Sequence, residues 1–359
     1  MAASAPEATA TDAQPQQTAS SSKTPLYEAS TQYRNWRFSR ESLAQMRASM
    51  NEAAVKAIRS KIEANEPGSS ANTTFLTPDE EVLLVKLYVA QVIAAGNKVR
   101  AQQETVSTAM SYLKRFYLRN TVMDWHPRNV MLTCLFLATK TCNAPLSIEY
   151  FVQQFQKTEP SDVLDLEFLV AQSLSFEFSV WHAQRALWGI WLDIQSLPDL
   201  TIDLQESVYN AAMAQVQASR FTDAEFIYTP SQIALASLAL TLPDAAKAWF
   251  NSKQSEAHPI DWAVIEEIMN LITTEGRPPN IDTVREIDRR LKLCKNPEKV
   301  PGSKAYVAKK MLEEKRAEER RNRKAAEAQK AIEEDPFGSD VAKPRIALVD
   351  YDDDDDDDD

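Results

Sequence analysis

Glycine and cysteine are scarce in this chain, whose 359 residues include six glycines and three cysteines. The sequence accordingly contains no Gly-rich loop of the kind that holds nucleotide phosphates. The cysteines are Cys134, Cys142 and Cys294, and they form neither a disulfide framework nor the paired spacing of a zinc site. We therefore expect a protein of a reducing compartment that carries no metal and no other cofactor.

Long apolar runs and a basic excess are also missing. No segment reaches the ~20 apolar residues of a membrane span, and the first residues lack an apolar signal region. We expect a soluble, intracellular protein without membrane contact. The net charge is -12, but Asp350 and the run Asp352–Asp359 supply nine negative charges, which leaves about -3 for the rest. A body without basic excess is not typical of a nucleic-acid binder, so we expect no direct contact with nucleic acid.

Signs of an active site are absent as well. The three histidines, His126, His182 and His258, lie far apart, and no nucleophile motif such as G-x-S-x-G occurs. The acidic cluster Asp79–Glu81 lies at a helix start, where the helix dipole accounts for it. We predict no catalytic residue, and hence a function that depends on binding.

What is abundant is helix-forming sequence. Ala, Leu, Glu, Gln and Lys dominate, and alternating Val/Ile/Thr runs are almost missing, so we predict an all-α fold. Residues 1–25 contain too little apolar surface to fold and should be disordered. Residues 26–76 should form an aromatic arm followed by a helix to about residue 63. Trp36 and Phe38 in this arm either pack on the body or contact a partner.

A first set of five helices is predicted over 77–178. It opens with the capping box Thr77-Pro78-Asp79-Glu80, and Gly96 should end this helix. The next helix covers about 102–118. The central one runs from Pro127 to Lys140 and is apolar on all sides, which indicates burial. A short helix opens at Ser147 and a longer one at Ser161.

A second set of five helices is predicted over 179–276. Its helices are expected at about 181–194, 203–218, 230–242, 244–252 and 260–275. A shift of 103 residues places Pro127 on Pro230 and Leu135 on Leu238. We infer an internal repeat of about 100 residues, each copy of which has a buried third helix.

The chain then becomes polar. Residues 277–296 should hold one amphipathic helix, about 281–294. Residues 297–334 form a charged helical extension, interpreted as a solvated helix, a nuclear-localisation signal or a partner helix. Residues 335–359 should be a disordered acidic tail.

Lys140 and Glu167 are the candidate contact residues. Lys140 ends the central helix, and Glu167 lies in an otherwise apolar stretch of the fifth helix. One interpretation is a local ion pair, which near a surface contributes ~0–1 kcal/mol. The other is that both side chains bond a partner's backbone, at ~1.5–3 kcal/mol for each charge-assisted bond. Spacing alone favours the ion pair and leaves the partner contact open.

Four stretches of the sequence resemble the cyclin family, with its two tandem five-helix cyclin boxes and flanking N- and C-terminal helices. They are TQYRNWRFSRESLAQMR (31–47), LKRFYLRNTVMDWHPRNVMLTCLFLATK (113–140), FLVAQSLSFEFSVWHAQRALWGIWLDI (168–194) and YTPSQIALASLAL (228–240). The resemblance covers about 26–295.

The resemblance implies that Lys140 and Glu167 bond the regulatory helix of a cyclin-dependent kinase, which reverses the choice made from spacing. It places apolar contacts at Leu137, Phe176 and Phe178. Thr141 and Ala171 stand where other cyclins carry an acidic or aromatic stretch and a leucine. The substrate-docking arginine of cell-cycle cyclins is absent from the matching EEVLLVKL (80–87).

Within the family, the resemblance is to the cyclin subunit of the CDK-activating kinase. It implies a nuclear regulatory subunit with three partners: the kinase catalytic subunit, a RING-finger assembly subunit and the core of general transcription factor H. The implied substrates are the RNA polymerase II C-terminal domain and the activation loops of other CDKs. The alternatives are a transcriptional cyclin of C, K or T type, a TFIIB-like cyclin-fold transcription factor, or a plain helical scaffold. The zinc ribbon and basic face of the TFIIB class are missing.

Overall fold

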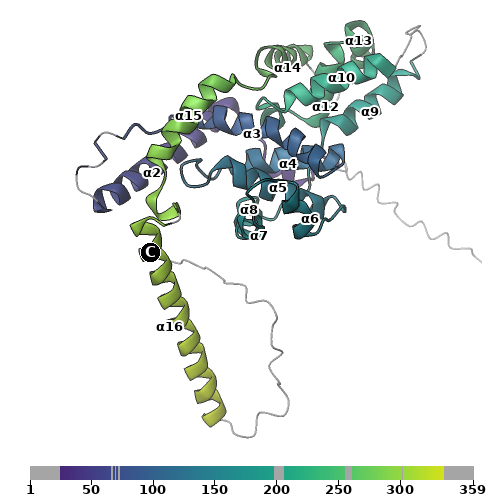
Figure 1. Cartoon of the computed structure of the whole chain (residues 1–359). Coiled ribbons are helices and arrows are strands. Elements are labelled where there is room, and N and C mark those ends of the chain that lie inside the picture. The colour runs from purple at the N-terminus through teal and green to yellow at the C-terminus, as the bar shows by residue number, and fades with distance from the viewer. Residues whose placement is uncertain are drawn as a thin grey trace, which may run out of the picture.

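The computed structural model describes residues 25–334 except 66–67, 69, 72, 198–205, 255–260 and 301. The predictions of disorder for residues 1–24 and 335–359 lie outside these residues, as does His258. Every regular element in the described part of the chain is a helix (Figure 1), which confirms the all-α prediction. Two groups of helices are visible, with one long helix projecting away from them.

The first helical set agrees closely with the sequence prediction. Its members are α3 (Pro78–Lys98), α4 (Gln103–Phe116), α5 (Pro127–Thr141), α6 (Ile148–Gln153), α7 (Pro160–Leu164) and α8 (Glu167–Ser173). The predicted capping box is present: Thr77 Oγ1 accepts from Glu80 N, and the Glu80 carboxylate accepts from Thr77 N.

Two details of the prediction are wrong. Gly96 does not end its helix but lies buried inside α3, where a Cβ atom would stand 2.4 Å from Val106 Cγ2. The glycine is needed for the close approach of this neighbour. The fifth helix is broken into α7 and α8 between Leu164 and Glu167, so Glu167 begins a helix rather than lying inside one.

The second helical set contains α9 (Ala183–Ile194), α10 (Glu206–Ser219), α11 (Ala224–Ile227), α12 (Pro230–Ala239), α13 (Pro243–Ser252) and α14 (Trp262–Glu275). The short α11 is absent from the sequence prediction. The inferred repeat is confirmed, because α5 and α12 both begin with proline and are both buried along most of their length. Each is packed against several neighbours of its own set, which explains why neither shows an amphipathic pattern.

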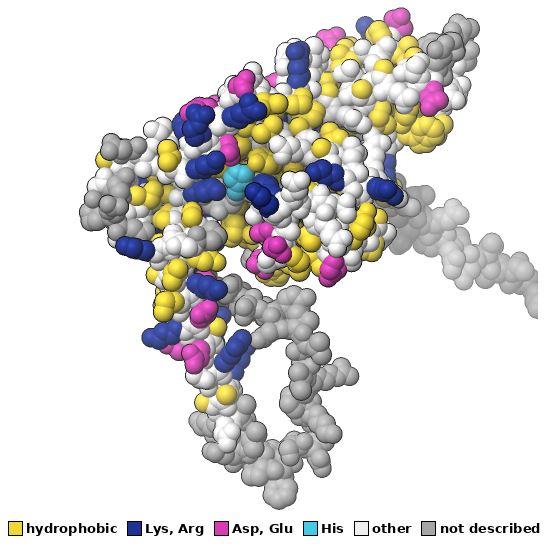
Figure 2. Space-filling model, in the orientation of Figure 1, with side chains coloured by type: hydrophobic (Ala, Val, Ile, Leu, Met, Phe, Trp, Pro, Cys, Tyr) yellow, Lys and Arg dark blue, Asp and Glu magenta, His cyan; other side chains and the backbone are white. Residues whose placement is uncertain are grey.

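Segments outside the two sets pack on them. They are α1 (Thr31–Asn35), α2 (Arg40–Asn65), α15 (Ile281–Cys294), η1 (Pro297–Lys299) and α16 (Lys304–Glu334). Both α2 and α15 pack on α3, and buried side chains of α15 such as Val284 join the core of the first set. In contrast, α16 leaves the body beyond η1 (Figure 1), and its basic and acidic side chains are interspersed (Figure 2).

Candidate partner-binding surface

The end of α5 holds a charged side chain at a defined place on the surface. Eleven of its 15 residues are buried, which fixes the helix in the core. Beyond Thr141 the chain turns away through Asn143, whose φ is 57°, and Ala144 N donates to Thr139 O at 2.9 Å. Lys140, on the last turn, is exposed there, and a cation at a helix C-terminus is favoured by the helix dipole.

Lys140 and Glu167 are brought together. Lys140 Nζ lies 2.6 Å from Glu167 Oε1, and the two side chains are 42% and 21% exposed. Glu167 is the first residue of α8, where the positive end of the helix dipole favours a carboxylate. The free chain therefore contains the ion pair that spacing suggested. Because the pair is accessible to solvent, its opening would cost only ~0–1 kcal/mol.

Two exposed aromatic rings lie beside this pair. Phe168 comes directly after Glu167 and is 50% exposed, and Phe176 is 55% exposed, with 6.0 Å between the two ring centroids. The half-buried Phe178 lies 6.3 Å from Phe176 and packs on Tyr112. Large apolar rings exposed together on a soluble protein indicate an interaction surface.

The turn that presents Phe176 is held in an unfavourable backbone conformation. Ser175 and Phe176 have φ values of 53° and 57°, a region that costs about 1–2 kcal/mol for a residue with a Cβ atom. The turn is closed by Phe176 N, which donates to Ala171 O at 2.9 Å, and by Glu177 N, which donates to Leu174 O at 3.0 Å. The strained turn keeps the ring of Phe176 at the surface.

The other implied contact residues lie deeper. Leu137 and Ala171 are 6% and 7% exposed, so they pack beneath the surface and expose little area of their own. Thr141 is half-buried, and its hydroxyl lies 3.0 Å from the hydroxyl of Tyr112. The sequence prediction omits Phe168 as a contact because it assigns this ring to the apolar side of one long helix. The signal is its position directly after Glu167, at a helix start.

The N-terminal arm packs on the body, as one of the two interpretations expected. Trp36 is 1% exposed, and its Nε1 donates to Glu177 Oε2 at 2.6 Å. The guanidinium carbons of Arg115 and Arg119 lie 4.9 and 4.7 Å from its ring. Because Glu177 is the residue after Phe176, the arm holds the far side of the turn that presents this ring.

Phe38 completes the attachment of the arm. Its N donates to Phe226 O at 2.7 Å, and the two rings pack edge to face. Trp36 and Phe226 belong to one small buried cluster. The arm therefore touches both helical sets.

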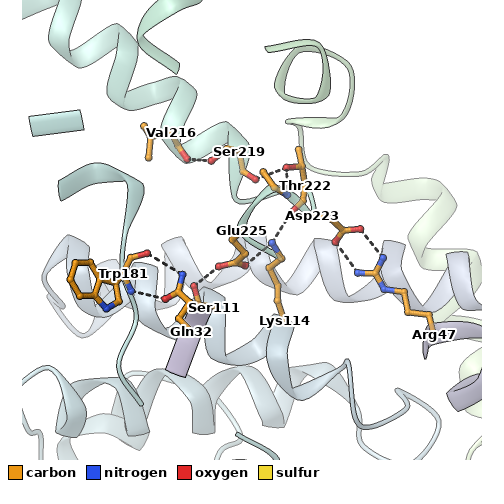
Figure 3. A network of polar contacts seen from close by, with 11 residues as sticks. Gln32, Arg47, Ser111, Lys114, Trp181, Val216, Ser219, Thr222, Asp223 and Glu225 are labelled. Atoms are coloured by element: carbon orange, nitrogen blue, oxygen red, sulfur yellow. Dashed lines mark hydrogen bonds and ion pairs between the residues drawn. The ribbon is translucent and has the colours of Figure 1, made fainter. Parts of the chain in front are cut away.

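A buried polar network joins the two sets (Figure 3). Lys114 Nζ of α4 lies 2.7 Å from Glu225 Oε1 of α11, and Ser111 Oγ donates to Glu225 Oε2 at 2.7 Å. Burial alone would raise the pKa of Glu225, but Lys114, Ser111 and Arg115 outweigh burial and lower it to about 2. Arg47 forms a two-pronged pair with Asp223 at 2.7 and 2.8 Å. These paired charges fix the orientation of one set on the other.

The remaining candidates for chemistry have structural partners. His182 is buried between the sets, where its Nε2 lies 2.9 Å from Thr108 Oγ1, and burial lowers its pKa to about 3. His126 Nε2 lies 3.0 Å from Asp288 Oδ1 of α15. Within the described residues, no cluster of His, Cys, Asp and Glu is arranged to hold a metal ion. Among the same residues, no helix combines the length and apolarity that crossing a membrane requires.

Comparison with known proteins gives consistent matches. The family "Cyclin, N-terminal domain" matches residues 82–179, and "Cyclin C-terminal domain" matches 182–275. Cyclin mcs2 of Schizosaccharomyces pombe is 30% identical over 87% of this chain and 98% of its own length. Cyclin-H of Xenopus laevis is 28% identical over 76% of this chain and 88% of its own.

Two solved assemblies contain a chain of the same fold. A chain in the CAK complex of Chaetomium thermophilum bound to ATP-γ-S superposes with a TM-score of 0.69. It is 30% identical, and the match covers 81% of this chain and 94% of that one. A chain in the yeast TFIIK (Kin28/Ccl1/Tfb3) complex has a TM-score of 0.57 and 29% identity, with 68% and 100% covered. Both assemblies match most of the length over which the two helical sets extend.

Proposed function

This chain belongs to the cyclin H group of the cyclin family, and we propose on that premise that it is the regulatory subunit of a CDK-activating kinase. In this role it binds a cyclin-dependent kinase and switches it on without chemistry of its own. The observation that carries the proposal is the exposed Lys140–Glu167 pair beside the rings of Phe168 and Phe176.

The surface has what a kinase helix would need. An ammonium group can bond a helix carbonyl, and a carboxylate can bond a backbone N–H, so the two charges suit the two kinds of backbone group. The rings of Phe168 and Phe176 provide apolar area next to these polar contacts. Leu137 and Ala171 support this surface from below, and Thr141 and Phe178 border it.

The mechanism depends on differential binding. In a free kinase the regulatory helix is displaced, and the Lys–Glu pair that orients the ATP phosphates does not form. A cyclin surface that bonds only the inward position of this helix shifts the population towards the active arrangement. The rigid core around α5 matters here, because a mobile surface would not favour one position of the helix over another.

The wider assembly is part of the same proposal. The partners would be the kinase catalytic subunit, a RING-finger assembly subunit and the core of general transcription factor H, in the nucleus. The substrates would be the RNA polymerase II C-terminal domain and CDK activation loops. Support comes from the similarity to chains of the CAK and TFIIK complexes.

Co-expression tests the proposal. The full chain is produced with the catalytic subunit of a CDK-activating kinase, with and without the RING-finger subunit, and in parallel with the kinase partner of a C-type cyclin. We expect a stable complex and phosphorylation of a polymerase-tail peptide with the first kinase. Activation of only the second kinase would assign the chain to another transcriptional cyclin class.

A further inference from the structure

A half-open pocket of about 60 Å³ lies where α2, α3 and α4 meet the turn between α10 and α11. Its apolar wall includes Val82, Val85 and Val89, which lie along one face of α3. Met50 of α2 and Phe221 of the turn close the other sides. The pocket thus spans both helical sets and the N-terminal helix, on elements different from the α5 end and α8 that form the candidate kinase surface.

The carboxylates of the pocket are already satisfied within the chain. Both oxygens of Asp223 accept from Arg47 (Figure 3). Glu81 Oε1 accepts from Asn51, and its Oε2 accepts from Thr121 Oγ1 at 2.8 Å and from Val122 N at 2.9 Å. These acidic groups therefore have little capacity left for a basic ligand.

Two cations of the pocket lack an acidic partner in the described part of the chain. Lys86 Nζ donates to the backbone oxygen of Glu275 at 2.6 Å. Arg220 donates to the neutral Gln184 Oε1 at 3.3 Å. No ion pair within 4.0 Å involves Lys86 or Arg220 among these residues. Burial lowers the pKa of both groups, that of Arg220 to about 10 despite the nearby Glu225 carboxylate. Half-buried cations of this kind are stabilised by an arriving anion.

We propose that this pocket binds a peptide segment of a partner protein through one aliphatic side chain, with an adjacent acidic residue paired to Lys86 or Arg220. The valine wall sets the aliphatic requirement, and the two cations without acidic partners set the acidic one. This binding is independent of the proposed kinase contact.

The size of the pocket favours a peptide over a small molecule. Sites for drug-sized ligands enclose ~300–1,000 Å³, whereas this pocket has about 60 Å³ and can enclose a single side chain. A segment that places one side chain in the pocket must bind its remaining length across the surface. The surrounding cations can then contact an acidic neighbour in the same segment.

Selection from a display library of random 12-residue peptides tests the proposal on the full chain. We expect the recovered peptides to carry Leu, Ile or Val within two residues of Asp or Glu. A recovered peptide is then measured by fluorescence anisotropy. Val82→Trp, which fills the pocket, should weaken binding at least tenfold. Val82→Ala, which enlarges the pocket without crowding the fold, should shift the preference towards a larger apolar residue.

A double-mutant cycle tests the charge contact. Lys86→Gln should weaken the acidic peptide about tenfold, as expected for the loss of a charge-assisted bond. The same substitution should not affect the peptide whose Asp is replaced by Asn. The matched control is Lys56→Gln, an exposed lysine of α2 that does not line the pocket.

Several results would overturn the proposal. These are a failure to recover any peptide, peptides without the aliphatic–acidic pattern, and binding that ignores both Val82→Trp and Lys86→Gln. A dimer in sedimentation that Val82→Trp dissociates would make the occupant a second copy of this chain. Alanine at Lys140 and Glu167 should leave peptide binding unchanged, so failure here is distinguishable from failure of the kinase contact.

Discussion

Replacing Lys140 and Glu167 together by alanine should abolish most kinase binding while leaving the fold intact. The two charges form a 2.6 Å pair at the surface, with side chains 42% and 21% exposed. An exposed pair of this kind contributes ~0–1 kcal/mol to stability. The melting temperature of the double variant should therefore stay within a few degrees of the wild-type value.

The loss of binding should be much larger. Each charge-assisted bond to a partner's backbone contributes ~1.5–3 kcal/mol, so two bonds give ~3–6 kcal/mol. The wild-type chain must first open its own pair, which subtracts ~0–1 kcal/mol. The net loss of ~2–5 kcal/mol corresponds to a Kd that rises by about 30-fold to a few thousand-fold.

Titration calorimetry with the purified kinase measures this change, and two further variants sharpen it. The charge swap Lys140→Glu with Glu167→Lys preserves an ion pair within the chain but reverses the charges offered to a partner, so it should bind as weakly as the double alanine variant. Arg185 and Glu104 form a comparable exposed pair at 2.6 Å, and alanine at both should not affect binding. Wild-type affinity in the double alanine variant, or full rescue by the swap, would refute a direct contact.

Three other changes test the fold and its link to the surface. Leu135→Ala should lower the free energy of unfolding by ~2–5 kcal/mol in urea titration, because it leaves a cavity around the buried α5, whereas Leu293→Ala at a 74% exposed position should have little effect. Trp36→Ala should cost ~3–5 kcal/mol and also weaken kinase binding, because Glu177 loses its donor and the turn of Phe176 loosens; unaltered binding at a temperature where the variant is folded would contradict that link. The pKa of His182 falls from 6.5 to about 3 on folding, so between these values the unfolded chain binds a proton that the folded chain does not, and stability should fall by about 1.4 kcal/mol per pH unit as pH decreases. His182→Asn should remove that slope in denaturation measured from pH 7 to pH 4.

Local signals explain which parts of the fold could be predicted from the sequence. The boxes at Thr77 and Thr229 act through bonds between neighbouring residues, so they are readable without knowledge of the fold. Burial of α5 and α12 is predicted by apolar residues on all sides. The break between α7 and α8 is not readable, because the apolar spacing continues through it. The outward direction of Phe168 escapes prediction for that reason.

Contacts between segments far apart in the chain could not be predicted at all. Lys114 and Glu225 are 111 positions apart, and nothing in either local pattern indicates the other. The same holds for Trp36 and Glu177, which are 141 positions apart. Such pairs depend on how the two sets pack. Spacing leaves the Lys140–Glu167 contact as one of two interpretations because these residues, too, are 27 positions apart.

The two equivalent core helices show why only one of them offers a partner surface. Burial is the same in α5 and α12, so the core role of the helix does not distinguish them. The difference lies in the path of the chain beyond the last turn. After α12 the chain enters α13 almost at once, with Leu242 as its cap and Pro243 as its first residue. After α5 the left-handed Asn143 turns the chain away, and no helix begins before Ile148. Lys140 therefore remains accessible at the end of a rigid helix, and a partner can read its position only because the repeat diverges at this exit.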